Sequence, residues 1–334
     1  MGGALGRVPA LAAALILPVL AIFAGLALLT FAADRFVDGA AALARNLGVS
    51  TLVIGLVVIG FGTSAPELLV SAMASLEGNP GISIGNALGS NVSNILLVAG
   101  FTALVRPLAV KSGIVRREFR VLGVATLLLW LLFADGRISR FDGVVLLVAM
   151  VASLTLLVRL SRGVAATDAI LEEVESAQAE SMRGPKAIAY TVGGLAGLLI
   201  GSRALVWGAS SIAAGLGVSD LVIGLTVVAI GTSLPELAAS IASARKGETD
   251  LVIGNIVGSN LFNSLAVIGL PGLLSPCVLP DGVLSRDMPI LTVTSLVFYW
   301  MSSRSKKGGV LSRPEGLVLL AGFVVYEFLL FFGG

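Results

Sequence analysis

A carboxylate among apolar residues is the feature of this sequence best suited to chemistry. Glu67 ends the segment Gly-Thr-Ser-Ala-Pro-Glu at residues 62–67, inside a mostly apolar stretch that covers residues 52–76. That stretch is long enough to cross a bilayer, where an ionisable group is costly unless it binds a partner. The pattern returns as Gly-Thr-Ser-Leu-Pro-Glu at residues 231–236, which ends in Glu236. The chain therefore carries two matched candidates for cation binding.

Each segment offers only hard oxygen ligands. Its proline lacks a backbone N–H and disrupts the preceding turn, so carbonyl groups near residues 60–63 are expected to lack helical partners. In a membrane such groups persist only where they are buried in protein or line a polar cavity. Thr63 and Ser64 add hydroxyl groups, and Glu67 adds a carboxylate about one turn later. These ligands suit sodium, calcium or magnesium.

The alternative is a kinked helix in which each glutamate pairs with a basic residue. Neither Glu67 nor Glu236 has a Lys or Arg within one or two helical turns on its own span. Arg203 is the nearest base expected inside the membrane, and one guanidinium cannot neutralise both carboxylates. Duplication of the whole segment further favours ion binding.

Asparagines follow each segment at positions i, i+5 and i+8 of Gly-Asn-x-x-Gly-Ser-Asn-x-x-Asn, at residues 85–94 and 254–263. Buried amides are costly unless they are hydrogen-bonded. Interhelical hydrogen bonding is the favoured role for four of them: Asn86, Asn91, Asn255 and Asn260. Asn94 and Asn263 follow their glutamates at the same spacing, which lets a helix, a turn and a returning helix place each at the depth of its glutamate. We predict that these two are ligands.

Composition predicts an all-α integral membrane protein. Of 334 residues, 56% are hydrophobic and 13% are charged, and the mean hydropathy is +1.00. Soluble domains are nearer a quarter charged. The sequence contains no His and one Cys, Cys277, which excludes His-ligated metal sites, His bases and an internal disulfide. Ten spans are expected, at about 11–33, 52–76, 82–105, 117–133, 142–160, 187–215, 220–244, 251–274, 287–302 and 314–333.

An internal repeat relates the two halves of the chain. Residues 51–100 align with residues 220–269 without a gap, and 24 of the 50 positions are identical. Five spans per half is an odd number, so the second half must enter the membrane from the opposite side. This predicts an inverted-topology repeat with broken helices at the midplane. The expected units are residues 1–160, an acidic linker at 161–186, and residues 187–334.

Basic residues orient the ten spans. The side that bears both termini holds 4 of the Lys and Arg residues, whereas the opposite side holds 17. Cytoplasmic loops carry the excess of Lys and Arg. We therefore expect an inner-membrane protein with both termini outside the cytoplasm and the linker inside it.

If the two halves face each other at the midplane, Glu67 and Glu236 converge. Two bare carboxylates in a low dielectric repel, and one would protonate. A divalent cation neutralises both, and two bidentate carboxylates with two backbone carbonyls would supply about six oxygens, within calcium's range. Two sodium ions, or protons, could balance the same charge. Such a site suits mutually exclusive occupancy, which exchange requires.

The paired Gly-Thr-Ser-x-Pro-Glu segments, each followed by Gly-Ser-Asn-x-x-Asn, resemble the alpha repeats of the sodium/calcium exchanger family, within the calcium/cation antiporter superfamily. The resemblance covers effectively the whole chain and is closest to compact prokaryotic members. It implies antiport of cytoplasmic calcium for external sodium by alternating access. Proton/calcium exchangers of the superfamily carry a different Gly-Asn-x-x-Glu-type signature.

The resemblance also implies roles for individual residues. Calcium is expected at Glu67 and Glu236, with the backbone carbonyls of Thr63 and Thr232. Sodium is expected at Ser64, Ser233, Ser90 and Ser259, with carbonyls at the positions that match Gly60 and Ala229. Asn94 and Asn263 match the central polar positions, and because residue 263 is Asn the expected core holds two acidic groups.

Other functions remain as alternatives. A proton-coupled cation antiporter is the nearest, and a cation channel is a rival from a different class. An intramembrane enzyme is disfavoured because the chain lacks His and a Gly-x-Ser-x-Gly segment. The expected partners are calcium, sodium and the lipid bilayer. No cofactor, nucleic acid or obligate protein partner is expected.

Replacement of either motif glutamate should separate transport from folding. We expect Glu67→Gln or Glu236→Gln to abolish calcium exchange, because the amide removes the charge that balances the cation, while membrane insertion remains intact. Flux in vesicles with matched protein content measures the effect. Near-normal exchange in either variant would contradict the proposed site.

Overall fold

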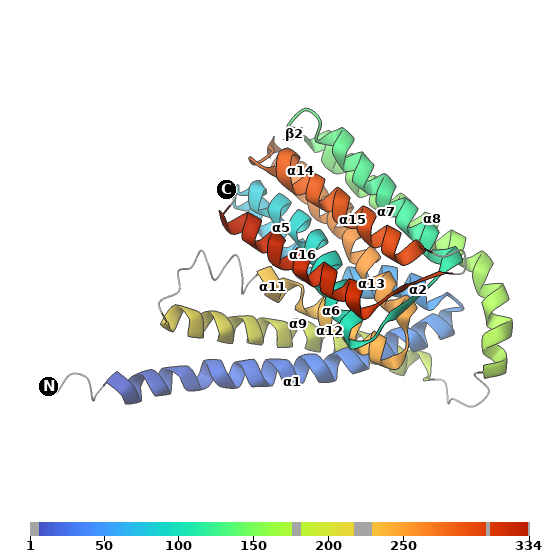
Figure 1. The fold of residues 1–334 in the computed structure, drawn as a ribbon, viewed down its shortest axis with the longest axis horizontal. Coiled ribbons are helices and arrows are strands. Elements are labelled where there is room, and N and C mark those ends of the chain that lie inside the picture. Colours follow the sequence, from blue (N-terminus) through green and yellow to red (C-terminus); the bar gives the residue numbers. More distant parts are fainter. Residues whose placement is uncertain (1–6, 176–181, 217–228, 305–307, 333–334) are drawn as a thin grey trace.

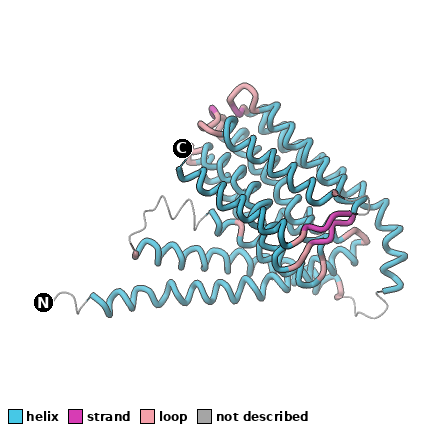
Figure 2. Tube along the Cα trace, viewed as in Figure 1, coloured by secondary structure: helices cyan, strands magenta, loops and turns pink. Residues whose placement is uncertain are grey.

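The chain folds into a bundle of helices in the computed structural model (Figures 1 and 2). The structure describes residues 7–175, 182–216, 229–304 and 308–332. The first half contains α1 (Arg7–Leu47), α2 (Thr51–Ile54), η1 (Gly55–Ile59), α3 (Gly60–Thr63), α4 (Ala65–Leu76), α5 (Pro80–Ser93), η2 (Asn94–Ala99), α6 (Gly100–Val105), β1 (Leu108–Lys111), α7 (Ser112–Leu132), β2 (Arg137–Ile138) and α8 (Arg140–Glu175). The second half contains α9 (Gly184–Gly215), α11 (Ala229–Thr232), α12 (Leu234–Lys246), α13 (Thr249–Phe262), η5 (Asn263–Val267), α14 (Ile268–Leu274), β3 (Cys277–Val278), η6 (Val283–Asp287), α15 (Met288–Ser303), β4 (Gly308–Leu311) and α16 (Arg313–Phe332).

The predicted helical class is confirmed. Two helices run well beyond their expected spans: α1 covers Arg7–Leu47 where residues 11–33 were expected, and α8 covers Arg140–Glu175 where residues 142–160 were expected. By length and composition, five of the described helices could cross a membrane: Leu15–Leu47, Pro80–Val105, Arg140–Arg159, Gly184–Gly215 and Thr249–Leu274. The bent pair Thr51–Thr63 and Ala65–Leu76 makes a sixth. The ten-span layout stays a prediction. Of the expected seventh span, the residues before Ala229 lie outside the described ranges.

Breaks interrupt the helices at the two glutamate segments, as their prolines predict. Ser64 leaves the helical region with φ −81° and ψ 5°, and α4 then begins with Pro66 in its first turn. The axes on either side of this break differ by 44°. Ser233 has nearly the same geometry, φ −85° and ψ 1°, just before α12. Each break starts a new helix whose first turn carries a glutamate.

Two short antiparallel ribbons were not predicted. β1 pairs with β4, and β2 pairs with β3. The ribbons lie at opposite ends of the helical bundle (Figure 2). Each joins a connection in the first half of the chain to one in the second half. Their apolar residues, among them Leu108, Ile138 and Leu311, belong to the buried core, so the ribbons tie the two halves together at its ends.

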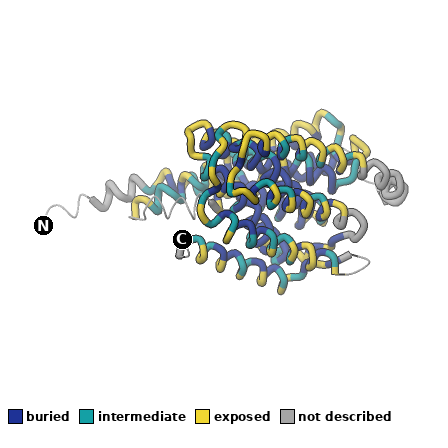
Figure 3. Tube along the Cα trace, turned by 90° about the horizontal axis from the view of Figure 1, so that it is seen from above, coloured by how far each residue is buried: buried dark blue, intermediate teal, exposed yellow. Residues whose placement is uncertain are grey.

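The most buried helices lie at the centre of the bundle (Figure 3). In α13 with its continuation to Leu274, 94% of the most apolar window is buried, compared with 22% in α1. The peripheral helices instead expose large apolar side chains, among them Phe23, Phe31 and Val148. This is the pattern expected where lipid rather than water covers the outside.

The long helices α1 and α9 pack side by side and extend beyond the rest of the bundle near the N-terminus (Figure 1). Glycines allow this close approach, and the contacts are reciprocal. A Cβ added to Gly25 would lie 2.9 Å from the backbone nitrogen of Leu205, and one added to Gly194 would lie 2.6 Å from that of Phe36. Gly25 and Gly194 occupy equivalent positions when the aligned repeat is continued towards the N-terminus, and so do Phe36 and Leu205. The repeat therefore extends into the packing of these helices.

The neighbouring pair Gly193 and Gly194 provides a matched test of this packing. Gly194→Ala should lower the thermal midpoint in detergent, because overpacking costs about 1–3 kcal/mol. Gly193→Ala should leave the midpoint equal or higher, because a Cβ there meets nothing within 4 Å and alanine favours helix. Fluorescence-detected thermal unfolding measures both. Equal midpoints for the two variants would contradict the close α1–α9 contact.

Candidate functional site

The two glutamates are buried at the start of separate helices from the two halves of the chain. Glu67 lies in the first turn of α4, Glu236 lies in the first turn of α12, and each is 1% exposed. The positive end of a helix dipole favours a negative charge at such a position. The two carboxylates are close enough to repel each other electrostatically. No ion pair in the described residues involves either one, so the alternative of a glutamate paired with a base is not observed there.

Hydroxyl groups predicted as ligands surround these carboxylates. Ser90 is the polar side-chain neighbour of Glu67. The hydroxyl groups of Thr63, Ser64 and Ser259 are the neighbours of Glu236. The structure thus brings hydroxyl groups from both halves to one pair of carboxylates.

Thr63 connects α3 to α13 across the repeat boundary. Its Oγ1 lies 3.1 Å from Asn255 Oδ1, 3.3 Å from Ser259 Oγ and 2.9 Å from the Ile59 carbonyl oxygen. A hydroxyl group has one proton, so Thr63 can donate to only one of these acceptors at a time. The acceptor oxygens that receive no proton from Thr63 therefore lie close together, with their lone pairs unshared, in a buried part of the protein.

The expectation of a free carbonyl at Gly60 is wrong in this conformation. The Gly60 carbonyl accepts a hydrogen bond from the Ser64 N–H at 3.1 Å and another from the Ser259 hydroxyl at 3.3 Å. The helix before the break keeps its last turn, because Pro66 removes a donor only further along the chain. Gly60 still lies beside Ser259, as the predicted sodium position requires. Ala229 begins α11 and Thr232 ends it.

The four asparagines expected to bond between helices do so, and the first of them in each half has an equivalent partner. Asn86 Nδ2 donates to the Glu67 carbonyl at 3.4 Å, and Asn255 Nδ2 donates to the Glu236 carbonyl at 3.1 Å. Asn91 Nδ2 donates to Ser264 Oγ at 2.9 Å, and Asn260 Nδ2 donates to the Asn91 carbonyl at 3.2 Å. The first two bonds hold the helices that carry the glutamates against α5 and α13, and the other two join α5 to α13 and its continuation.

A group of predicted ligands has buried polar atoms without a hydrogen-bond partner in the described structure. A buried polar atom without a hydrogen-bond partner costs about 1–3 kcal/mol unless water or a ligand satisfies it. The group comprises Ser64 Oγ, Glu67 Oε2, Ser233 Oγ, both carboxylate oxygens of Glu236, and both amide atoms of Asn94 and of Asn263. All six residues are at most 1% exposed. Carboxylate, hydroxyl and amide oxygens are the ligands of hard cations, so this donor set fits sodium or calcium.

The described residues contain no group of three or more His, Cys, Asp or Glu that could hold a metal ion. Among the described residues, a cation at this site would therefore have two carboxylates supplemented by neutral oxygens. Affinity for a cation falls as the number of charged ligands falls. A donor set with only two carboxylates therefore suits a transported ion, which must be released, better than a permanently bound one.

A cluster of buried serines beside the site was missed by the sequence reasoning. Ser83 Oγ lies 3.0 Å from Ser75 Oγ and donates to the Ser71 carbonyl at 2.7 Å, which joins α5 to α4. Ser240, the repeat counterpart of Ser71, accepts from Asn255 Nδ2 at 2.9 Å. The identity of Ser71 and Ser240 in the aligned repeat was the available signal.

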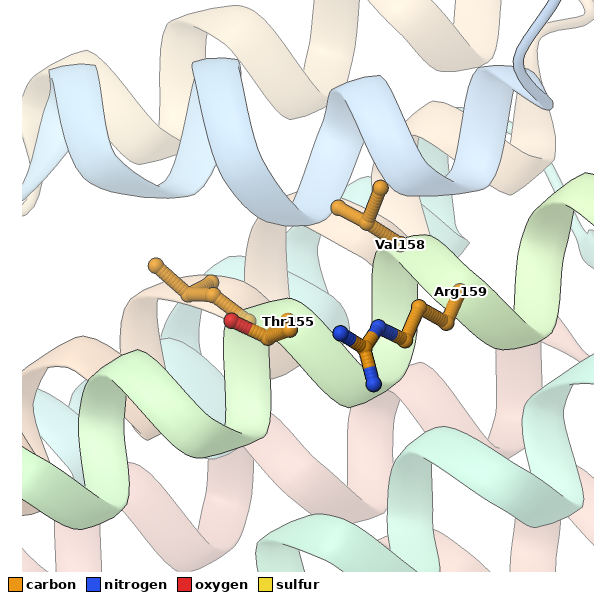
Figure 4. Close-up of a pocket in the computed structure, with 4 residues that line it drawn as sticks. Thr155, Val158 and Arg159 are labelled. Atoms are coloured by element: carbon orange, nitrogen blue, oxygen red, sulfur yellow. The ribbon is translucent and has the colours of Figure 1, made fainter.

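A separate pocket of about 320 Å³ lies on α8 and is lined by Leu154, Thr155, Val158 and Arg159 (Figure 4). None of the predicted ligands lines it. The carboxylates are thus enclosed within the bundle rather than exposed in this pocket.

Comparison with known proteins agrees with this geometry. The family model described as "Sodium/calcium exchanger protein" matches residues 17–159 and 186–332. An Alkalimonas amylolytica protein named "Putative antiporter CaxA" is 44% identical over 93% of this chain and 97% of its own. The inner membrane protein YrbG of Escherichia coli is 38% identical over 93% and 95%. A solved structure of the sodium-calcium exchanger NCX_Mj matches with a TM-score of 0.79 and 35% identity, over 93% of this chain and 98% of that one.

Two asparagines on neighbouring turns test which amides bind the ion. Asn94→Leu should leave the thermal midpoint without calcium unchanged or higher, because it removes an unpaired buried amide. It should also abolish the rise in midpoint that calcium causes by mass action. Asn91→Leu should lower the midpoint itself, since it breaks the bond to Ser264. Retention of the calcium-induced rise in Asn94→Leu would contradict ligation.

Proposed function

Because the chain belongs to the sodium/calcium exchanger family, we propose that it exchanges sodium for calcium by alternating access and extrudes calcium from the cytoplasm. One observation carries the proposal: two buried carboxylates from repeated segments meet among polar atoms that lack protein partners. Membership of this family makes the chain a membrane cation antiporter. The choice of sodium as the coupling ion and the direction of transport belong to the proposal.

Two ions share the site in the proposed cycle. Calcium binds Glu67 and Glu236 together with the carbonyls of Thr63 and Thr232. Sodium binds at hydroxyl groups and backbone carbonyls around the same carboxylates, with Asn94 and Asn263 between them; the assigned positions are Ser64, Ser233, Ser90, Ser259, Gly60 and Ala229. The proximity of Ser90 to Glu67 and of Ser64 and Ser259 to Glu236 supports this assignment.

Charge balance makes the two occupancies exclusive. Two ionised carboxylates in a low dielectric repel unless cations neutralise them. One calcium ion or two sodium ions supply the same charge. Once either kind has bound, the carboxylates are neutralised and no longer attract the other kind. Exchange follows when the loaded site opens alternately to each side of the membrane.

The membrane topology is part of the proposal: ten spans in two inverted repeats, with both termini outside the cytoplasm. Contacts between connections support it, because elements expected on one side pair with each other. β1 pairs with β4, both on the expected cytoplasmic side, and β2 pairs with β3, both on the expected outer side. Arg106 Nη1 likewise donates to the Ala244 carbonyl, which is expected on the same side.

The proposed units are two repeats, residues 1–160 and 187–334, joined by a cytoplasmic linker at 161–186. α8 continues to Glu175, so the linker begins as an extension of that helix. Residues 176–181 lie outside the described ranges. The acidic composition of this segment fits a solvated connection.

Calcium flux under separately imposed gradients tests the function. Inside-out vesicles loaded with sodium should take up calcium from sodium-free medium, with the pH and potassium gradients collapsed. Glu236→Gln should abolish uptake. Glu327→Gln should retain it, because Glu327 is a half-buried carboxylate on α16 outside the site.

Other outcomes would overturn the proposal. Uptake that requires only a pH gradient would assign proton coupling instead. Unitary currents through the purified protein would assign a channel. Calcium uptake that proceeds in Glu236→Gln at the wild-type rate would show that the carboxylate pair is not the transport site.

A further inference from the structure

A charged cluster joins α1 to the end of α12 on the expected cytoplasmic side. Lys246 Nζ lies 2.6 Å from Asp38 Oδ1 and 3.9 Å from Asp34 Oδ1, and it donates to the Asp34 carbonyl at 3.1 Å. The two aspartates are one helical turn apart and therefore share one face of α1. We call Lys246, Asp34 and Asp38 the inner clasp.

The α12 end of the inner clasp is fixed to the rest of the bundle. Arg106 Nη1 donates to the carbonyls of Ala244 and Arg245 at 3.1 Å each. These are among the last carbonyls of α12, which ends at Gly247 in the left-handed conformation with φ +83°. Because Arg106 follows α6 directly, the inner clasp connects α1 to the core that holds the glutamates rather than to a loose loop.

The repeat places a second pair of charges at the opposite side, with the polarity reversed. The repeat alignment relates Asp34 to Arg203 on α9, and Lys246 to Glu77 at the end of α4. The backbone supports the equivalence, since Gly78 after Glu77 has φ +80°, close to that of Gly247. Asp34 with Lys246, and Arg203 with Glu77, are thus two equivalent pairs that each contain one acid and one base. We call Arg203 and Glu77 the outer clasp.

The outer clasp is apart in this structure. Arg203 and Glu77 are both exposed, and neither has an ion pair or side-chain hydrogen bond within the described residues. The packing of the two long helices, α1 and α9, shows the same difference between the two ends. α1 packs against α12, whereas α9 makes no comparable contact with α4 in the described part of the chain. The charged contact between a long helix and the helix that carries a glutamate is therefore made at one end of the described structure and not at the other.

We propose that the inner and outer clasps are alternating latches: the inner clasp holds the cytoplasmic side of the site closed, and the Arg203–Glu77 pair forms when that side opens. The inference rests on the proposed alternating-access function and adds the residues that set which side is open. Pseudo-symmetric halves can exchange conformations, so a contact made by one half is available to the other in the opposite state.

The strength of such a pair suits a latch that must release. Exposed ion pairs contribute little, enough to bias an equilibrium about two- to fivefold. A ligand-driven cycle can reverse a bias of this size, whereas a buried pair would trap one state. The inner clasp has two acids for one base, while Asp38 corresponds to the uncharged Trp207 in the outer clasp. The inner-closed state is thus the favoured one without ions.

Apparent affinities from the two sides test the latches in transport. Lys246→Gln should raise the apparent affinity for cytoplasmic calcium and lower that for external calcium, by about two- to fivefold. Arg203→Gln should shift the ratio in the opposite direction. Lys246→Arg should restore wild-type values. Arg45→Gln removes a cytoplasmic charge that is exposed and outside both clasps, so it should shift neither affinity.

Cross-linking tests the latches without requiring transport. In a Cys277→Ser background, Glu77→Cys with Arg203→Cys should cross-link weakly with a short bifunctional thiol reagent. Addition of Lys246→Gln should increase the yield, and Arg45→Gln should not. An unchanged yield with Lys246→Gln would overturn the coupling of the clasps. Because this readout is independent of ion flux, a failure of sodium/calcium exchange in the wild type would be distinguished from a failure of the latches.

Discussion

The repulsion between two buried carboxylates is the constraint on which the rest of this structure depends. Glu67 and Glu236 are each 1% exposed, and no base pairs with them in the described residues. A low dielectric makes two adjacent negative charges unstable unless cations accompany them. This cost arises at the breaks before α4 and α12, where the helix N-termini lower it only in part and neighbouring serine hydroxyl groups are themselves without partners. In the proposed cycle, the bound ion would therefore stabilise the loaded state as well as being its cargo.

The candidate site could be predicted from the sequence because its proposed ligands lie close together in the chain and recur in both halves. A proline and a glutamate in an apolar run predict both the break and the carboxylate, and the return of the same segment in the second half predicts the partner. The contacts between the two halves could not be predicted from the sequence. The hydrogen bond of Ser259 to the Gly60 carbonyl joins positions far apart in the chain, and no local pattern indicates that it satisfies a carbonyl expected to be free. The β1–β4 ribbon was missed for the same reason.

The asparagines show how neighbouring residues of one type divide between structure and function. Asn91 and Asn260 form bonds between helices, whereas the amides of Asn94 and Asn263 have no partner in the described structure. Periodicity alone could not separate them, because all four recur at equivalent positions in both halves. The depth of the glutamates, estimated from the equal spacing between each glutamate and its last asparagine, is the reason that Asn94 and Asn263 are predicted as ligands. The amide oxygens of Asn91 and Asn260 also lack a partner, so the difference is that both amide atoms of Asn94 and of Asn263 are unpartnered. A wholly unpaired buried amide needs an explanation, and ion binding supplies one.

Symmetry in the core and asymmetry at the ends have different physical origins. Around the glutamates the two halves repeat the same oxygen-bearing residues, as the proposed binding of one ion by both halves requires. At the ends the halves need only complementary charges, so Arg203 and Glu77 could form in the opposite state, with reversed polarity, the contact that Asp34 and Lys246 form here. An exactly symmetric molecule would favour neither side. The stronger cluster at Lys246 breaks that balance, which gives an exchanger with a symmetric site a defined resting orientation.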